Sequence, residues 1–212
     1  MDSSRGPGGA TVNASVISAQ VPAGSWNAFC GIVSPDAPSS NVGNSSINIT
    51  CRSLADGTSV AAPTPFDASG EVDLDAVRHN TAMWIAAGVD GVLVLGSTGE
   101  AGHVDDAEGE AVIAAAREAV PRDRMLLAGT GRQSTAATTA FTRRAAAAGA
   151  DVVLVVTPNY YRPELTRDAY LRYYERVADE AEIPVYLYNV PVFTGITLAA
   201  DLVAELSKHP RI

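Results

Sequence analysis

The chain has 212 residues, of which 47% are hydrophobic and 18% are charged, a composition typical of a globular protein rather than a disordered one. It contains no run of 18 apolar residues, so the sequence excludes a transmembrane helix and predicts no membrane partner. The formal net charge of −9 disfavours nucleic acid as a partner, because the phosphate backbone would repel the protein.

Residues 1–59 differ in composition from the rest of the chain. Thirty-one of these 59 residues are Gly, Ser, Pro, Thr or Asn, and only five are charged. Such a segment buries little apolar surface, so the entropy cost of ordering it is poorly offset. We predict a disordered extension, with a segment translated from a faulty gene model as the alternative. Residues 1–59 have the features of neither a secretory signal nor a transit peptide, which predicts a cytoplasmic protein. Cys30 and Cys51 are predicted to be free thiols.

From Val60 onward, short apolar runs alternate with amphipathic stretches. The apolar runs are rich in β-branched residues and almost continuously hydrophobic, as is typical of strands buried on both faces of a parallel sheet. In chain order, the pattern predicts strands over 60–62, 92–95, 125–128, 152–156 and 185–188. The helices predicted from the intervening and following stretches cover 73–87, 105–119, 134–148, 166–181 and 197–208.

Local signals support these boundaries and reveal a repeat. Asp105 and Glu108 have the spacing of a capping box at a helix start. The sequence Ala-Ala-Gly-Val-Asp at 86–90 recurs as Ala-Ala-Gly-Ala-Asp at 147–151, an offset of 61 residues. That offset equals two β/α units of about thirty residues each, which predicts an α/β fold of the barrel or doubly wound type. Periodicity alone does not separate these two folds.

The candidate functional groups follow the strands, since parallel β/α folds gather them at the carboxyl ends. Gly96-Ser97-Thr98-Gly99-Glu100 follows the second predicted strand, and its hydroxyl groups could donate hydrogen bonds to a carboxylate or phosphate. The alternative is a tight strand-to-helix turn without function. Thr157-Pro158-Asn159-Tyr160-Tyr161 follows the fourth strand, and Tyr188-Asn189-Val190-Pro191 closes and follows the fifth. A phenol beside a water chain or cation can relay protons.

Other candidates are weaker. The helical tyrosines are predicted to be packing residues: Tyr170, Tyr173 and Tyr174. The glycines at 129–131 match a dinucleotide-binding loop poorly. The histidines have no metal-ligand spacing, so neither a metal site nor a cofactor is predicted.

Three of these motifs, at 96–100, 157–161 and 188–191, with Thr194-Gly195 after the last, resemble the dihydrodipicolinate synthase / N-acetylneuraminate lyase superfamily of class I aldolases. Residues 63–67 also fit that family's first strand and turn, so the resemblance covers about 59–212. It implies a (β/α)8 barrel, of which residues 60–212 supply the first five β/α units. It also implies a lyase that binds a 2-oxo acid, usually pyruvate, as a Schiff base on a lysine.

The resemblance also assigns roles to individual residues. Ser97, Thr98 and Gly99 would bind the substrate carboxylate, with Ser97 and Thr98 also in a proton relay. Tyr188 would be the general acid/base, and Tyr160 would complete the relay, reaching a neighbouring subunit in some members. Full-length relatives are expected to be homo-oligomers.

Phe193 departs from the family pattern, because dihydrodipicolinate synthases have an arginine there for a dicarboxylic substrate. Phe193 is therefore a predicted substrate-binding residue that favours 4-hydroxy-2-oxoglutarate or 2-keto-3-deoxy acid aldol cleavage. Dihydrodipicolinate synthase-type condensation is the alternative. A non-catalytic half-barrel remnant and an anion-binding doubly wound protein are further alternatives.

The lysine is the second departure. The resemblance implies a Schiff-base lysine on a sixth strand, shortly after Ile212. The one lysine in the sequence is Lys208, at the end of the last predicted helix, where it would stay solvated. We expect a chain truncated before its catalytic lysine.

Overall fold

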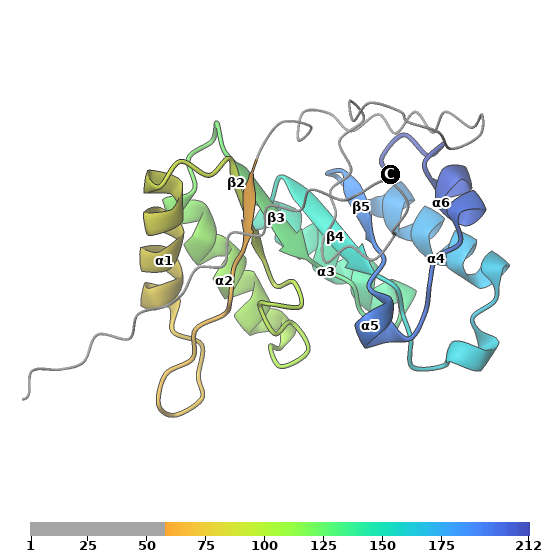
Figure 1. The fold of residues 1–212 in the computed structure, drawn as a ribbon, viewed down its shortest axis with the longest axis horizontal. Helices are drawn as coiled ribbons and strands as arrows, with labels where there is room; N and C mark the ends of the chain where they lie inside the picture. The colour runs from red at the N-terminus through yellow and green to blue at the C-terminus, as the bar shows by residue number, and fades with distance from the viewer. Residues whose placement is uncertain (1–57) are drawn as a thin grey trace, which may run out of the picture.

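The computed structural model describes residues 58–212, and the predicted extension lies outside the described residues except for its last two positions. Five parallel strands form one sheet in sequence order (Figure 1): β1 (Ser59–Ala61), β2 (Gly91–Val94), β3 (Met125–Gly129), β4 (Val152–Val156) and β5 (Val185–Tyr188). Each strand begins and ends within one residue of its predicted range. A doubly wound sheet reverses its strand order near the middle, so this order excludes that alternative and confirms a barrel sector.

The longer helices also follow the prediction, and four of them lie within one residue of it: α1 (Leu74–Ala86), α2 (Asp106–Ala119), α3 (Thr135–Ala147) and α4 (Arg167–Glu180). The last, α6 (Ala200–Leu206), begins three residues later than predicted. In the segment before it, the Leu198 N–H donates to Asn189 Oδ1 at 3.1 Å, which ties this segment to the loop after β5. Two short elements were not predicted, the 3-10 turn η1 (Arg162–Glu164) and α5 (Pro191–Thr194).

The predicted capping box is present at the start of α2. Asp105 Oδ1 accepts hydrogen bonds from the N–H groups of Ala107 and Glu108, and the Glu108 carboxylate accepts from the Asp105 N–H at 2.8 Å. The box satisfies N–H groups that have no partner inside the helix. It also fixes where α2 begins after the turn that carries Ser97.

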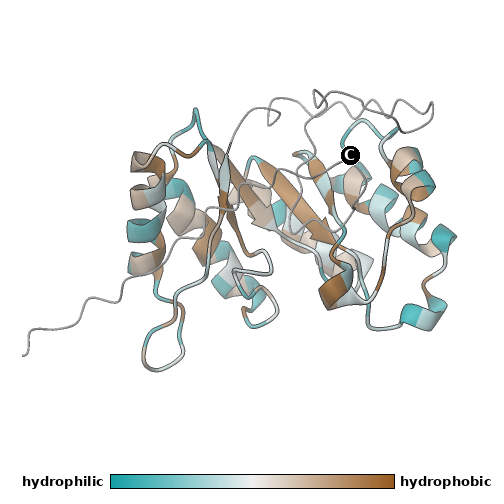
Figure 2. Ribbon diagram, viewed as in Figure 1, coloured by the Kyte–Doolittle hydropathy of each residue, from teal (hydrophilic) through white to brown (hydrophobic). Residues whose placement is uncertain are grey.

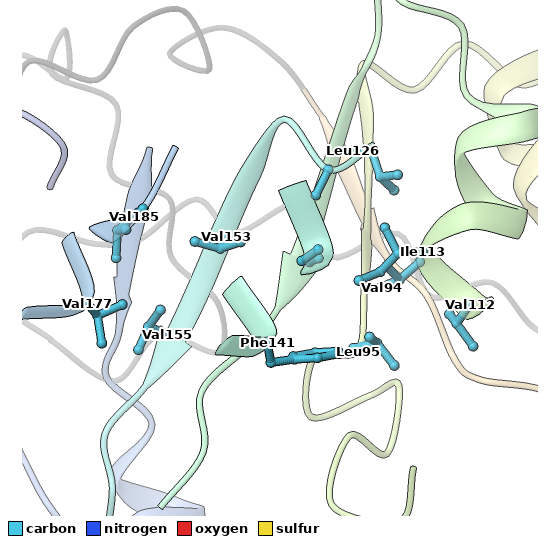
Figure 3. Packing of buried hydrophobic residues seen from close by; sticks show 14 of the residues in the cluster. Val94, Leu95, Val112, Ile113, Leu126, Phe141, Val153, Val155, Val177 and Val185 are labelled. Carbon is cyan, nitrogen blue, oxygen red and sulfur yellow. The ribbon is translucent and has the colours of Figure 1, made fainter. Parts of the chain in front are cut away.

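The two faces of the sheet differ in what covers them. Alternate strand residues such as Val94 and Val153 pack with Ile113 of α2 and Phe141 of α3 in the main core (Figure 3). Helices α1, α2, α3, α4 and α6 all contribute buried residues to this core. The opposite face carries a smaller cluster of strand residues only: Leu93, Leu127, Val152 and Leu154, with Ala61, Met125, Tyr186 and Tyr188 beside them. Helices on one face and strand side chains on the other are the two sides of a barrel wall.

The distribution of apolar residues follows this layering. Figure 2 shows nearly continuous apolar strands, whereas the helices carry both apolar and hydrophilic residues. Strands buried on both faces read as continuous apolar runs, and helices buried on one face alternate. Within residues 58–212, no helix is long and apolar enough to cross a bilayer.

The repeated Ala-Ala-Gly-x-Asp sequence has a structural role at the amino ends of the strands. The Asp90 carboxylate accepts from the Thr58 N–H at 2.8 Å and from Arg124 Nη1 at 2.7 Å. Asp151 Oδ2 accepts from the Leu126 N–H and from Arg117 Nη1, both at 2.8 Å. Each aspartate therefore ties the start of one strand to the preceding strand.

Replacing Arg117 with methionine is expected to lower the free energy of unfolding by about 2–4 kcal/mol. The Arg117 side chain is only 9% exposed, and besides Asp151 it donates to the carbonyls of Gly149, Val120 and Pro121. Methionine keeps the volume but leaves these acceptors without their donor. Urea unfolding measures the change, with Arg172→Met on the exposed face of α4 as the matched control. Equal stability of the two variants would contradict the assigned role.

Candidate functional site

Ser97 and Tyr188 come together at the carboxyl end of the sheet. Ser97 Oγ lies 3.1 Å from the Tyr188 hydroxyl, although 91 residues separate them. Neighbouring strands are about 4.8 Å apart, so β2 and β5 would be about 14 Å apart in a flat sheet. Curvature brings the two hydroxyl groups together on the face opposite the helices, where Tyr188 borders the strand-only cluster. The prediction that these two residues share one end of the sheet is confirmed.

The turn that carries Ser97 has a strained backbone. Leu95 and Glu100, at its two ends, have φ angles of 56° and 50°, which are rare for residues other than glycine. Such strain persists only where surrounding contacts impose it, and it concentrates at functional sites. This geometry favours a functional loop over a plain turn.

Close contacts from β3 and from the segment after β1 hold the strained turn in place. A Cβ atom at Gly129 would lie 1.9 Å from the Leu95 carbonyl oxygen, so β3 approaches the turn more closely than a side chain allows. The buried Thr64 hydroxyl donates to the Gly99 carbonyl at 2.6 Å. A Cβ at Gly99 would lie 2.9 Å from the Leu95 nitrogen. Positions 99 and 129 therefore have no room for a side chain, and only glycine fits at either of them.

The turn leaves polar groups available to a ligand. Ser97 and Thr98 are exposed, and within residues 58–212 the Thr98 hydroxyl has no hydrogen-bond partner. Neither residue's backbone N–H donates to another group in this part of the chain. Gly99 is buried beneath them, so its predicted part in substrate binding would be through the backbone. Together, the turn offers hydroxyl and N–H donors suited to an anionic oxygen.

Tyr160 lies at the same end of the sheet but not in contact with the Ser97–Tyr188 pair. Its ring is 76% exposed and packs edge to face on Tyr161, with 4.9 Å between ring centroids. Its hydroxyl has no hydrogen-bond partner among the described residues. The structure therefore does not complete the predicted relay within residues 58–212, and the role of Tyr160 stays a prediction.

Gln133 fixes the backbone of the loop that carries Tyr160, a role the sequence analysis missed. Gln133 Oε1 accepts from the N–H groups of Asn159 at 2.9 Å and Tyr160 at 3.0 Å. Its Nε2 donates to Asn159 Oδ1 at 2.9 Å. Its position two residues after Gly131, in the segment that follows β3, is a signal that could have found it.

The helical tyrosines Tyr170, Tyr173 and Tyr174 are buried, which confirms their predicted packing role. The Tyr174 hydroxyl lies 3.4 Å from the Val155 carbonyl and 3.5 Å from Thr157 Oγ1, which in turn lies 3.5 Å from the Tyr188 carbonyl. Tyr173 donates to the Arg132 carbonyl at 3.2 Å. Burial raises the pKa of Tyr173 to about 12 and raises the pKa of Tyr174 as well. Both phenols therefore stay protonated: Tyr174 contacts the end of β4, and Tyr173 contacts the segment after β3.

Short helix α5 follows Tyr188 and presents apolar side chains. Phe193 is 59% exposed and Val192 is 72% exposed. The Thr194 hydroxyl donates to the Val190 carbonyl at 3.1 Å and so closes the loop after β5. The predicted substrate contact of Phe193 is not tested by this geometry.

Lys208 lies at the opposite end of the sheet. It is exposed, and it follows α6, which returns the chain to the amino end of β5. There the Val185 N–H donates to the Arg211 carbonyl at 2.7 Å. Because Val185 begins the strand that Tyr188 ends, Lys208 and Tyr188 belong to different ends of the molecule. Among the described residues, no group of three or more His, Cys, Asp or Glu could hold a metal ion.

Comparison with known proteins gives the same family across this region. Residues 55–212 match the model of the dihydrodipicolinate synthetase family. The 4-hydroxy-tetrahydrodipicolinate synthase of Stenotrophomonas maltophilia (strain K279a) is 45% identical over 156 residues, covering 74% of this chain and 52% of the relative. The synthase of Methanospirillum hungatei is 42% identical over 161 residues, covering 75% of this chain and 54% of the relative.

Solved structures show the same relationship. The chloride-inhibited dihydrodipicolinate synthase from Acinetobacter baumannii, in complex with pyruvate, is 34% identical with a TM-score of 0.69, covering 74% of this chain and 53% of that one. The synthase from Agrobacterium tumefaciens is 35% identical with the same TM-score, covering 74% and 52%. The chain thus spans about half the length of the curated relatives that it matches. From these matches and its fold, the chain belongs to the dihydrodipicolinate synthetase family.

Proposed function

We propose that the site at Ser97, Thr98 and Tyr188 binds a 2-oxo acid such as pyruvate, for a condensation of the dihydrodipicolinate synthase type. The observation that carries this proposal is the 3.1 Å contact between the Ser97 and Tyr188 hydroxyls beside the open N–H and hydroxyl donors of the turn. A carboxylate needs convergent donors, and a carbonyl group that is attacked at its carbon, or enolised at the adjacent carbon, needs a proton donor at its oxygen. The site offers both within one end of the sheet.

The choice of reaction follows the relatives. Phe193 favoured aldol cleavage of 4-hydroxy-2-oxoglutarate in the sequence analysis, whereas the relatives quoted above are named as synthases. These names support the alternative reading, condensation, better than the preferred one. Since the chain spans about half of each relative, the activity, a homo-oligomeric assembly and a cytoplasmic location are part of this proposal.

Ser97, Thr98, Tyr188 and Tyr160 would have different roles in binding and proton transfer. Ser97 and Thr98 would bind and orient the 2-oxo acid carboxylate through their hydroxyl and N–H groups. Tyr188 would hold a proton at the substrate carbonyl oxygen, and Ser97 would exchange that proton with Tyr188 across their hydrogen bond. Tyr160, whose ring is exposed, would complete the proton relay either in its own chain or in the site of a second copy of the chain.

Replacing Ser97 with alanine is expected to weaken pyruvate binding about tenfold, because one hydrogen bond to a charged group is lost at an exposed site. Nuclear magnetic resonance titration of the Thr98 and Gly99 amide signals measures the dissociation constant. Ser207→Ala, at the other end of the sheet, is the matched control. Equal pyruvate affinity in the Ser97 variant, or binding of inorganic phosphate but not pyruvate, would contradict the proposal.

A further inference from the structure

An arginine without an ion-pair partner stands beside the candidate site. Most arginines among residues 58–212 pair with carboxylates: Arg78, Arg117, Arg124, Arg132, Arg143, Arg144, Arg167 and Arg176. Arg162 has no such partner among the described residues, although the protein is acidic, with a formal charge of −9. The other arginines without ion pairs, at 122, 172 and 211, do not follow the carboxyl end of a strand. Arg162 is thus the exception at the functional end of the sheet.

The Arg162 guanidinium packs directly against the loop that continues from Tyr188. A Cβ atom at Gly195 would lie 2.1 Å from Arg162 Nη1 and 3.3 Å from Cζ. Gly195 has a φ of 67° and ends α5, which begins three residues after Tyr188. The absence of a side chain at 195 therefore makes the room that the guanidinium occupies. In this position Arg162 joins the loop after β4 to the end of α5, the helix that carries Phe193.

The chemistry of the proposed reaction calls for a second cation there. The product named for the relatives, 4-hydroxy-tetrahydrodipicolinate, carries two carboxylates. The donors of Ser97 and Thr98 serve one of them, and Phe193 has no charge with which to bind the other. A guanidinium presents a planar pair of donors that fits a carboxylate with two hydrogen bonds. Its exposed, unpaired state leaves those donors ready for a ligand.

We propose that Arg162 is a specificity-determining residue that binds the second, distal carboxylate of a dicarboxylic substrate or product. This inference rests on the proposed function, because it assigns the second anchor of the same ligand. It places the charge on the loop after β4 instead of on α5. The site would then accept a dicarboxylic ligand even though Phe193 occupies the middle of α5.

Two 2-oxo acids of equal length test the proposal on the 212-residue chain. 2-Oxoglutarate has a distal carboxylate, whereas 2-oxopentanoate ends in a methyl group. Titrations followed at the amide signals of Ser97 and Thr98 give both dissociation constants. The wild-type chain is expected to bind 2-oxoglutarate about tenfold more tightly, since a charge-assisted pair is gained. Arg162→Gln should bring the ratio close to one by weakening 2-oxoglutarate alone, and Arg162→Lys should restore part of it.

Arg122→Gln is the control, because Arg122 is also exposed and without an ion pair but lies in the turn before β3, at the amino end. It should keep the wild-type ratio. A wild-type ratio of one, or an unchanged ratio in Arg162→Gln, would overturn this inference while pyruvate binding leaves the proposed function standing. If pyruvate itself produces no shift at Ser97 and Thr98, the proposed function fails and this inference fails with it.

Discussion

Replacing Gly129 with alanine is expected to lower the free energy of unfolding by about 3–5 kcal/mol, a loss at the upper end of single substitutions. The added methyl carbon would lie 1.9 Å from the Leu95 carbonyl oxygen and 2.7 Å from its carbon. Both are backbone atoms, so no side-chain rotation relieves the overlap. The end of β3 or the turn after β2 must therefore move.

Gly102→Ala is the matched control for this variant. An added Cβ at Gly102 meets no atom within 4 Å, and its φ is not in the left-handed region. Its unfolding free energy is expected to stay within about 0.5 kcal/mol of the wild type, as is usual for exposed positions. Chemical denaturation of both variants measures the difference. Similar stability of the two would show that β3 does not hold the Ser97 turn as described.

If the Gly129 variant still folds, the overlap at Leu95 should also change pyruvate binding at the proposed site. Gly129 of β3 lies against the Leu95 carbonyl, so a movement of the turn that relieves the overlap would carry Ser97 away from Tyr188. Pyruvate affinity should then fall together with stability. This coupling links a packing constraint on the sheet to the arrangement of the proposed binding site.

The sequence predicted the sheet closely for a physical reason. Strands such as β4 (Val152–Val156) are buried on both faces, so burial produces an uninterrupted apolar run with little ambiguity in its bounds. Helix α2 was equally clear because Asp105 and Glu108 satisfy its first N–H groups through a local motif. In both cases the determining interactions lie within a few residues.

The features that the sequence did not predict depend on distant contacts. The positive φ of Leu95 accompanies the close approach of Gly129, which lies in β3 more than thirty residues further along the chain. The three hydrogen bonds of Gln133 depend on the pairing of β3 with β4, which places the loops after these two strands side by side. Helix α5 is four residues long, too short for a helical period to appear. Arg162 could not be distinguished from other arginines until its neighbours in space were known.

Borohydride reduction of the 212-residue chain in the presence of pyruvate is expected to leave Lys208 unmodified and to accompany no turnover of 2-oxo acids. Imine formation needs an unprotonated amine, which a lysine obtains by desolvation or from a neighbouring cation. Lys208 is exposed and lies near the Glu205 carboxylate, whose pKa is lowered chiefly by Arg167 and in part by Lys208. Lys208 therefore lacks the buried setting that a Schiff-base lysine requires.

The position of Lys208 is a second reason to expect no adduct on it. Lys208 belongs to the amino end of β5, whereas a pyruvate held by Ser97 and Tyr188 lies at the carboxyl end. Extending the chain with the remaining strands of the Stenotrophomonas maltophilia relative should therefore place a trapped pyruvyl group on a lysine of the added part. In that longer chain, Tyr188→Phe should lower turnover by about 10²–10⁴-fold, the usual contribution of one positioned acid/base group. Phe keeps the ring and removes only the hydroxyl that contacts Ser97, so a loss of turnover with unchanged pyruvate affinity would assign the proton transfer to Tyr188.

A pyruvyl adduct on Lys208 together with turnover by the 212-residue chain would instead show that the nucleophile acts from the other end of the sheet, and the assigned site would be wrong.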